Sequence, residues 1–192
     1  MAERRKHALV VGGTGMLRGL TLALAEEGYA VSVIARTAAR LDSLAAAAKD
    51  APGLINPLSL DYRDGTRLQE ALRRAAGQFG PIVLAVCWIH STAPAALRQI
   101  AEVIGESGAP CRLFHVRGSA VANPAAEAKR LPEWLGRYPS IQYRQVILGF
   151  VIEHGRSRWL THQEISGGVL AAVRADRELS IVGTVEPWSL RP

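Results

Sequence analysis

The feature that most constrains this chain is an apolar run that ends in closely spaced glycines. Residues 9–19 read Leu-Val-Val-Gly-Gly-Thr-Gly-Met-Leu-Arg-Gly, and an amphipathic segment over residues 20–27 follows. Glycine is required in such a turn because the chain must tighten after a strand. A phosphate also reaches main-chain N–H groups and a helix N-terminus only where no Cβ intervenes. Gly12 and Gly15 fit these two requirements, so the pattern predicts the start of a dinucleotide-binding unit.

The turn is recognisable but irregular. Its third glycine, which lets the helix pack closely on the strand, is expected near position 18, but Arg18 stands there and Gly19 follows. Arg18 fits a different role, as a phosphate ligand. We expect the phosphates of a dinucleotide to contact the residues of this turn, namely Gly12, Gly13, Thr14, Gly15, Met16, Leu17 and Arg18.

Short apolar runs alternate with helical patterns along the chain, which is typical of a parallel sheet covered by helices on both faces. Seven strands are expected, over residues 7–11, 30–35, 54–60, 82–88, 112–116, 143–151 and 179–182. Helices are expected over residues 20–27, 38–49, 66–78, 94–107 and 165–173, the last after a capping box at residues 161–164, and a short one over residues 125–130. The sequence therefore predicts one doubly wound, Rossmann-like α/β domain over residues 1–192.

Charge and cysteine content narrow the possible functions. The net charge is +6, but the 23 Lys and Arg residues are scattered, so we expect a small-molecule substrate, and a nucleic-acid partner is the weaker alternative. The apolar run at residues 8–11 is too short for a signal peptide or a membrane span, and a cytoplasmic protein without membrane association is expected. Cys87 and Cys111 lack the spacing of a metal site or a disulfide framework and are expected to be reduced, buried thiols.

The end of the second expected strand bears on the choice of cofactor. An acidic residue about 20 residues past the glycines would bind the ribose hydroxyls of NAD, but the sequence has Arg36 there, with Arg40 close by. A guanidinium pairs with a phosphate in bidentate geometry, so NADP(H) is favoured over NAD, although a solvated arginine at a strand end is the alternative. Asp61 and Tyr62, after the third strand, are candidates for contacts with the adenine, and Asp61 fits a helix start equally well.

In order and spacing these segments resemble the short-chain dehydrogenase/reductase superfamily from residue 7 to residue 182. The lead-in at residues 79–82 matches the segment before that family's Asn-Asn-Ala-Gly loop, but here Trp88 and His90 replace small residues that contact the cofactor ribose. Residues 149–151 resemble the family's Pro-Gly-x-Val segment, with Leu148 in place of the proline. The resemblance implies that the main chain at Gly149 and Val151 holds the nicotinamide, and that the protein forms a homo-oligomer.

The family's catalytic residues are incompletely matched. They are a Tyr proton donor, a Lys four residues later that lowers the pKa of the phenol, and a Ser that orients the substrate. No Tyr-x-x-x-Lys occurs in this sequence; the nearest analogue pairs Tyr138 with Gln142 across Pro139. Ser119 fits the serine position if the strand end is shifted by one residue, but a polar turn residue is an equally good interpretation.

Other side chains are candidates for the acid. His90 and Tyr143 are placed near strand ends, at the edge where open α/β sheets bind ligands, whereas His115 fits a core position better. Arg156 and Arg158 fall where the family has a substrate loop and fit either an acidic ligand or plain solvation. The sequence thus predicts an oxidoreductase that transfers hydride between NADPH and a small carbonyl-type substrate. The alternative is a non-catalytic NADP(H)-binding redox sensor or structural partner.

Overall fold

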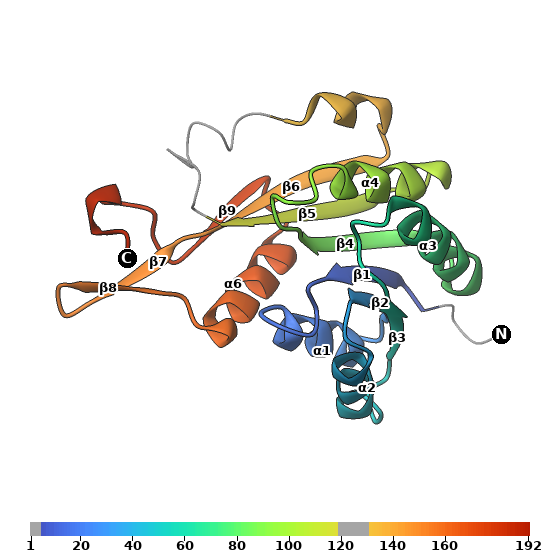
Figure 1. Cartoon of the computed structure of the whole chain (residues 1–192), viewed down its shortest axis with the longest axis horizontal. Coiled ribbons are helices and arrows are strands. Elements are labelled where there is room, and N and C mark those ends of the chain that lie inside the picture. Colours follow the sequence, from blue (N-terminus) through green and yellow to red (C-terminus); the bar gives the residue numbers. More distant parts are fainter. Residues whose placement is uncertain (1–4, 119–130) are drawn as a thin grey trace.

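The computed structural model describes residues 5–118 and 131–192. Seven parallel strands form one sheet in the order β3-β2-β1-β4-β5-β6-β9 (Figure 1). The strands are β1 His7–Val11, β2 Ala30–Ala35, β3 Leu54–Ser59, β4 Ile82–Trp88, β5 Cys111–Gly118, β6 Ile141–Leu148 and β9 Leu179–Val182. This confirms the predicted Rossmann-like fold. Because the order reverses between β1 and β4, the carboxyl ends of these two strands form the crevice where such sheets bind ligands.

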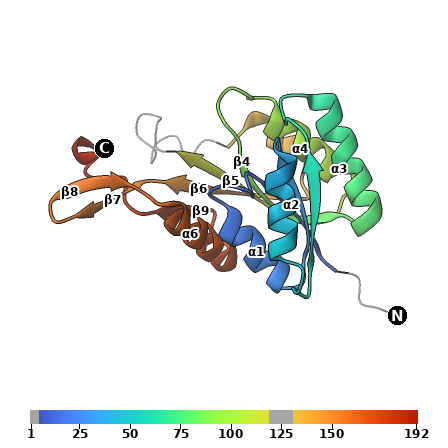
Figure 2. The same ribbon diagram turned by 60° about the horizontal axis from the view of Figure 1, so that its bottom comes forward.

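Helices cover both faces of the sheet (Figure 2). They are α1 Arg18–Glu26, α2 Ala38–Ala47, α3 Gly65–Phe79, α4 Ala96–Glu106 and α6 His162–Ala175. The buried side chains of α1, α2 and α6 pack in one core cluster, whereas those of α3 and α4 pack in a second cluster. The sheet lies between the two cores, so its strands are apolar on both faces, as expected for parallel strands.

The ends of two helices are fixed by local hydrogen bonds. Asp64 accepts a hydrogen bond from the main-chain N–H of Arg67 at the start of α3. The capping box predicted at residues 161–164 is present, with the Thr161 hydroxyl and the Glu164 carboxylate each bound to the other's main-chain N–H. These caps satisfy N–H groups that a helix leaves without partners at its first turn.

The region around the sixth strand differs from the prediction. The expected strand over residues 143–151 is divided: β6 ends at Leu148, and a separate hairpin of β7 Phe150–Glu153 and β8 Arg156–Trp159 follows. Its turn at His154 and Gly155 has positive φ angles of 51° and 75°, as a two-residue hairpin turn requires. The apolar residues of β7 continued the pattern of β6 in sequence, which concealed the break. The helix expected over residues 125–130 lies outside the described residues, and a 3₁₀ helix at Glu133–Arg137 follows that segment.

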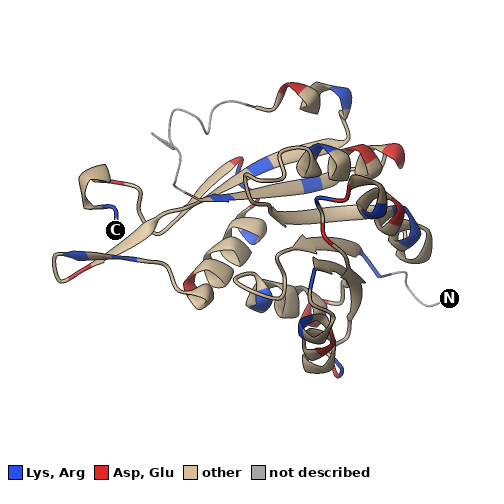
Figure 3. Cartoon of the chain, viewed as in Figure 1, with Lys and Arg blue, Asp and Glu red and all other residues tan. Residues whose placement is uncertain are grey.

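The two cysteines are free and buried, and burial raises the pKa of both thiols. Within residues 5–118 and 131–192 no group of His, Cys, Asp and Glu is arranged to hold a metal ion. In the same residues, none of the helices combines the length and apolarity needed to cross a membrane. Figure 3 shows Lys and Arg distributed over the helices and strands together with Asp and Glu.

Candidate functional site

A groove of about 430 Å³ lies at the carboxyl ends of β1, β2 and β4, where the strand order reverses. It is lined by Gly12, Thr14, Gly15, Met16, Ile34, Ala35, Arg36, Thr37, Arg40, Leu60, Tyr62, Trp88, His90 and His162. The glycine turn forms one side of the groove, and the residues at the ends of β2 and β3 form another. The groove therefore brings together, from four separate segments, most of the residues that the sequence nominated for cofactor binding.

The glycines of the turn have different structural roles. Gly12 has a φ of 89°, and its carbonyl oxygen accepts a hydrogen bond from the N–H of Gly15 at 3.2 Å. A Cβ on Gly13 would lie 2.7 Å from the Thr21 hydroxyl and 2.8 Å from a methyl of Val33. Gly13 thus lets the turn pack against α1 and β2, and it does not line the groove.

Close helix packing at Gly19 explains the irregular spacing of the fingerprint. A Cβ there would lie 2.9 Å from the hydroxyl of Ser166 on α6, and the same hydroxyl accepts a hydrogen bond of 2.6 Å from the N–H of Leu20. The last glycine of the turn therefore serves the contact between α1 and α6. Arg18 lines a neighbouring cavity of about 510 Å³, which it shares with Gly15 and His162, and Leu17 is fully buried.

Two arginines that follow β2 border the groove. Arg36 and Arg40 both line the groove, and no ion pair or hydrogen bond to either side chain occurs among the described residues. The nearest acidic candidate, Asp61, is bound by the guanidinium of Arg63, with 2.6 Å between Arg63 Nη2 and Asp61 Oδ2. The hydrogen bonds from Arg63 lower the pKa of Asp61 to about 2. Asp61 does not line the groove, whereas Tyr62 does.

Trp88 forms the floor between the groove and a further cavity. A Cβ on Gly12 would be 3.3 Å from the Cβ of Trp88, and one on Gly118 would be 3.5 Å from the far edge of the indole. The imidazole of His90 contacts the indole edge-on, with 5.8 Å between the ring centroids. The N–H of His90 donates a hydrogen bond to the Tyr62 hydroxyl at 3.3 Å. His90 therefore lies in the groove beside the residues that follow β3.

The three residues nominated for catalysis are not brought together in the described residues. Tyr143 is buried on β6, and its hydroxyl lies 2.7 Å from Nδ1 of His115 on β5. Burial raises the pKa of Tyr143 to about 12 and lowers the pKa of His115 to about 4. Neither side chain lines one of the cavities described here, and His90 lies in the groove. Ser119 lies outside the described residues.

Gly149 and Val151 lie farther along the sheet. Gly149 lines a cavity of about 230 Å³ that shares Met16 and Trp88 with the groove. Val151 pairs with Arg158 inside the hairpin. At Phe150 the main chain exchanges two hydrogen bonds, of 2.8 and 2.9 Å, with Thr184. The N–H and C=O groups of Phe150 are thus used within the fold.

Sequence reasoning missed His162, the first residue of α6, which lines the groove and the neighbouring cavity. The capping box fixed its position in the helix, but only the packing of α6 on α1 brings it beside Gly15. Thr37 and Leu60 were also missed. The available signal was their position at or just past the ends of predicted strands, because the carboxyl ends of parallel strands share one edge.

Part of the chain resembles known proteins in sequence. Residues 6–87, from β1 to β4, match the family described as short chain dehydrogenase. A D-erythrulose reductase from Gallus gallus is 37% identical over 108 residues, which are 56% of this chain and 39% of that reductase. The chain thus spans about two fifths of the length of this curated relative.

Two solved structures show the same fold. An alcohol dehydrogenase from the archaeon Thermococcus sibiricus, complexed with 5-hydroxy-NADP, is 15% identical, with a TM-score of 0.65 over 94% of this chain and 96% of that chain. An NADH-dependent reductase complexed with NAD is 14% identical, with a TM-score of 0.71 over the same shares of the two chains. The first four strands of this chain therefore resemble short chain dehydrogenases in sequence, and the chain as a whole shares the fold of these two structures.

Proposed function

We propose that the chain is an NADP(H)-binding oxidoreductase whose substrate is a small carbonyl compound. The choice of cofactor rests on Arg36 and Arg40, which line the groove and whose side chains form no ion pair or hydrogen bond among the described residues. A 2′-phosphate would receive bidentate hydrogen bonds from such guanidinium groups, whereas the ribose hydroxyls of NAD call for an acidic acceptor. Asp61, the nearest acidic residue, already binds Arg63.

The glycine turn suits the pyrophosphate. Helix α1 has no side-chain cap, and among the described residues the main-chain N–H groups of Thr14 and Met16 donate to no protein acceptor. Free N–H groups beside a helix N-terminus attract an anion through their partial positive charge. When bound, NADPH supplies a hydride to a carbonyl carbon, and the oxygen takes a proton to give an alcohol. The Trp88 indole and Met16 would border the end of the cofactor where that transfer occurs.

The second candidate, a nucleotide-binding protein without turnover, is favoured by the state of Tyr143. Its hydroxyl is held by His115 at 2.7 Å, and burial raises its pKa to about 12, which is the reverse of what a proton donor at neutral pH requires. Of the side chains nominated as the acid, His90 is then the one that lines the groove, and His162, which was not nominated, lines it too. Following NADPH oxidation by absorbance with a carbonyl panel that includes D-erythrulose separates the two functions, since a sensor binds NADPH but oxidises none.

Replacing Arg36 with alanine is expected to weaken NADPH binding by about ten- to a hundredfold and to leave NADH binding within about twofold. The expected loss is that of one charge-assisted contact, about 1.5–3 kcal/mol. Fluorescence titration of both nucleotides measures it. Arg98→Ala is the matched control, because Arg98 is an exposed arginine on α4 that does not line the groove. Equal losses for NADPH and NADH in Arg36→Ala would contradict the proposed 2′-phosphate contact.

A further inference from the structure

An apolar cavity adjoins the nucleotide groove. Its volume is about 230 Å³, and it is bordered by the side chains of Met16, Trp88, Leu148, Trp159, Leu160 and Ile165. Met16 and Trp88 also line the groove, so the two spaces share a wall. Among the described residues that line this cavity, Arg191 is the charged one. A cation at the end of an otherwise apolar cavity is costly unless it meets an anion.

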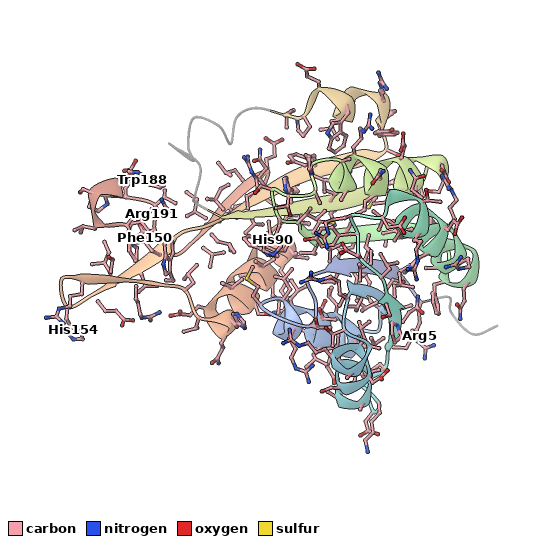
Figure 4. The ribbon with its side chains drawn as sticks, in the orientation of Figure 1. Arg5, His90, Phe150, His154, Trp188 and Arg191 are labelled. Atoms are coloured by element: carbon pink, nitrogen blue, oxygen red, sulfur yellow. The ribbon has the colours of Figure 1, made fainter. Side chains whose placement is uncertain are left out.

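Arg191 is held in place without being neutralised. Its guanidinium carbon lies 5.2 Å from the ring centroid of Trp159 and 5.0 Å from that of Trp188. Figure 4 shows Arg191 and Trp188 on the C-terminal segment, alongside the β7–β8 hairpin. Its Nε is buried and donates to no acceptor, and no ion pair involves Arg191 within the described residues. Two indole faces orient the guanidinium but offer it no hydrogen-bond acceptor.

Two carboxylates, one in the hairpin and one at the start of α6, are bound by another arginine. Arg158 binds Glu153 at 2.6 Å and Glu164 at 2.9 Å. The Glu153 pair joins the two strands of the hairpin, and the Glu164 pair attaches the hairpin to the start of α6. The donors of Arg191 remain available for a ligand.

We propose that this cavity receives the substrate and that Arg191 binds a carboxylate on it, which makes the substrate class an oxo acid with a small apolar body. The assignment of the ligand as a substrate rests on the proposed function, because it places the cofactor on the other side of Met16 and Trp88. A carboxylate matches the fork of a guanidinium, and its single charge equals that of Arg191. A phosphate carries more charge and more bound water than one arginine between apolar walls can compensate.

The test compares an acid with its uncharged ester by isothermal titration calorimetry. The probes are 4-methyl-2-oxopentanoate and its methyl ester, and NADPH is titrated separately into each protein. In the wild type the acid is expected to bind at least about tenfold more tightly than the ester. Arg191→Met is expected to reduce that preference to less than about twofold while NADPH affinity stays unchanged, since Arg191 does not line the groove.

Arg156→Met is the matched control, because Arg156 is an exposed arginine of the same hairpin that lines neither space. It is expected to retain the wild-type preference. Equal binding of acid and ester by the wild type, or an undiminished preference in Arg191→Met, would overturn the proposal. The wild-type comparison needs no variant. If Arg191→Met folds poorly, Arg191→Lys replaces it; this variant keeps a cation near the indoles and is expected to retain part of the preference.

The same experiment separates this inference from the proposed function. If NADPH binds but the acid has no advantage over the ester, the carboxylate site is wrong and the proposed cofactor stands. If the acid binds through Arg191 but NADPH does not bind, the carboxylate site stands and the proposed oxidoreductase function fails.

Discussion

Replacing Gly149 with alanine is expected to lower the free energy of unfolding by about 3 kcal/mol or more, and the melting temperature by about 10 °C. A Cβ on Gly149 would overlap the carbonyl oxygen of Thr184 and would lie 2.7 Å from its carbonyl carbon and 3.2 Å from its nitrogen. All three atoms are main chain and cannot rotate away. Moving either segment breaks the paired hydrogen bonds between Phe150 and Thr184, and Phe150 is fully buried.

Gly167→Ala is the control for this substitution. Gly167 lies within α6, and a Cβ there would meet nothing within 4 Å. Alanine is the better helix former by about 1 kcal/mol, so this variant is expected to be as stable as the wild type or slightly more stable. Thermal unfolding of the two variants measures both effects. If Gly149→Ala melts together with the wild type, the segment around Thr184 does not lie against Gly149 as described.

Acidification from pH 6.5 to pH 4 is expected to destabilise the protein by up to about 3 kcal/mol through His115 alone. Burial lowers the pKa of His115 from 6.5 to about 4 in the folded chain, with a smaller contribution from the charge of Arg117. Between these two pH values the unfolded chain binds a proton that the folded chain does not bind. Stability is therefore fully present above pH 6.5 and is lost as the pH falls towards 4.

A second buried histidine adds to this loss. Burial lowers the pKa of His7, although its hydrogen bond to Gly80 opposes the shift. Its Nδ1 lies 2.8 Å from the Gly80 carbonyl, and its Nε2 lies 2.8 Å from the hydroxyl of Ser32, which accepts a hydrogen bond from Asn56. With Nδ1–H donating to Gly80, Nε2 of the neutral ring accepts from the Ser32 hydroxyl. A second ring proton would make Nε2 a donor and deprive the Ser32 O–H of this acceptor.

Urea unfolding at several pH values between 7 and 4 measures this slope. His115→Asn is expected to have a shallower dependence than the wild type, because it removes one titrating group. His154→Asn, in the exposed turn of the hairpin, is expected to leave the slope unchanged. An identical slope in the wild type and in His115→Asn would show that His115 is not buried in the neutral form.

The sequence predicted the sheet well because each strand is apolar on both faces and each crossover carries local signals. The starts of β1, β2, β3, β4 and β9 fall at the predicted residues, and the capping box correctly marked the start of α6. The break at Gly149 was not predicted. It depends on Thr184, which lies 35 positions away in the sequence and is brought there by β9. A contact between distant segments leaves no periodic pattern in either of them.

The candidate site was predictable only where its residues lie next to predicted strands. The glycine turn and Arg36 lie next to predicted strands, and both were found from spacing alone. Tyr143 was nominated as an acid because the sequence placed it near a strand end. Only the register between β5 and β6 brings its hydroxyl to His115, away from the groove. Arg191 has no distinguishing sequence context, and its position between two indoles follows from the path of the C-terminal segment.

By itself, the sequence determined a doubly wound sheet with a glycine-rich turn at its switch point, because local spacing of glycines, apolar runs and caps is enough to specify those elements. The tertiary structure decided which side chains face the same space. In the tertiary structure Gly13 and Gly19 allow close packing, Asp61 forms an ion pair with Arg63, and Arg191 lines an apolar cavity. Each of these depends on the approach of segments far apart in the chain, and such approaches are fixed by packing across the whole sheet.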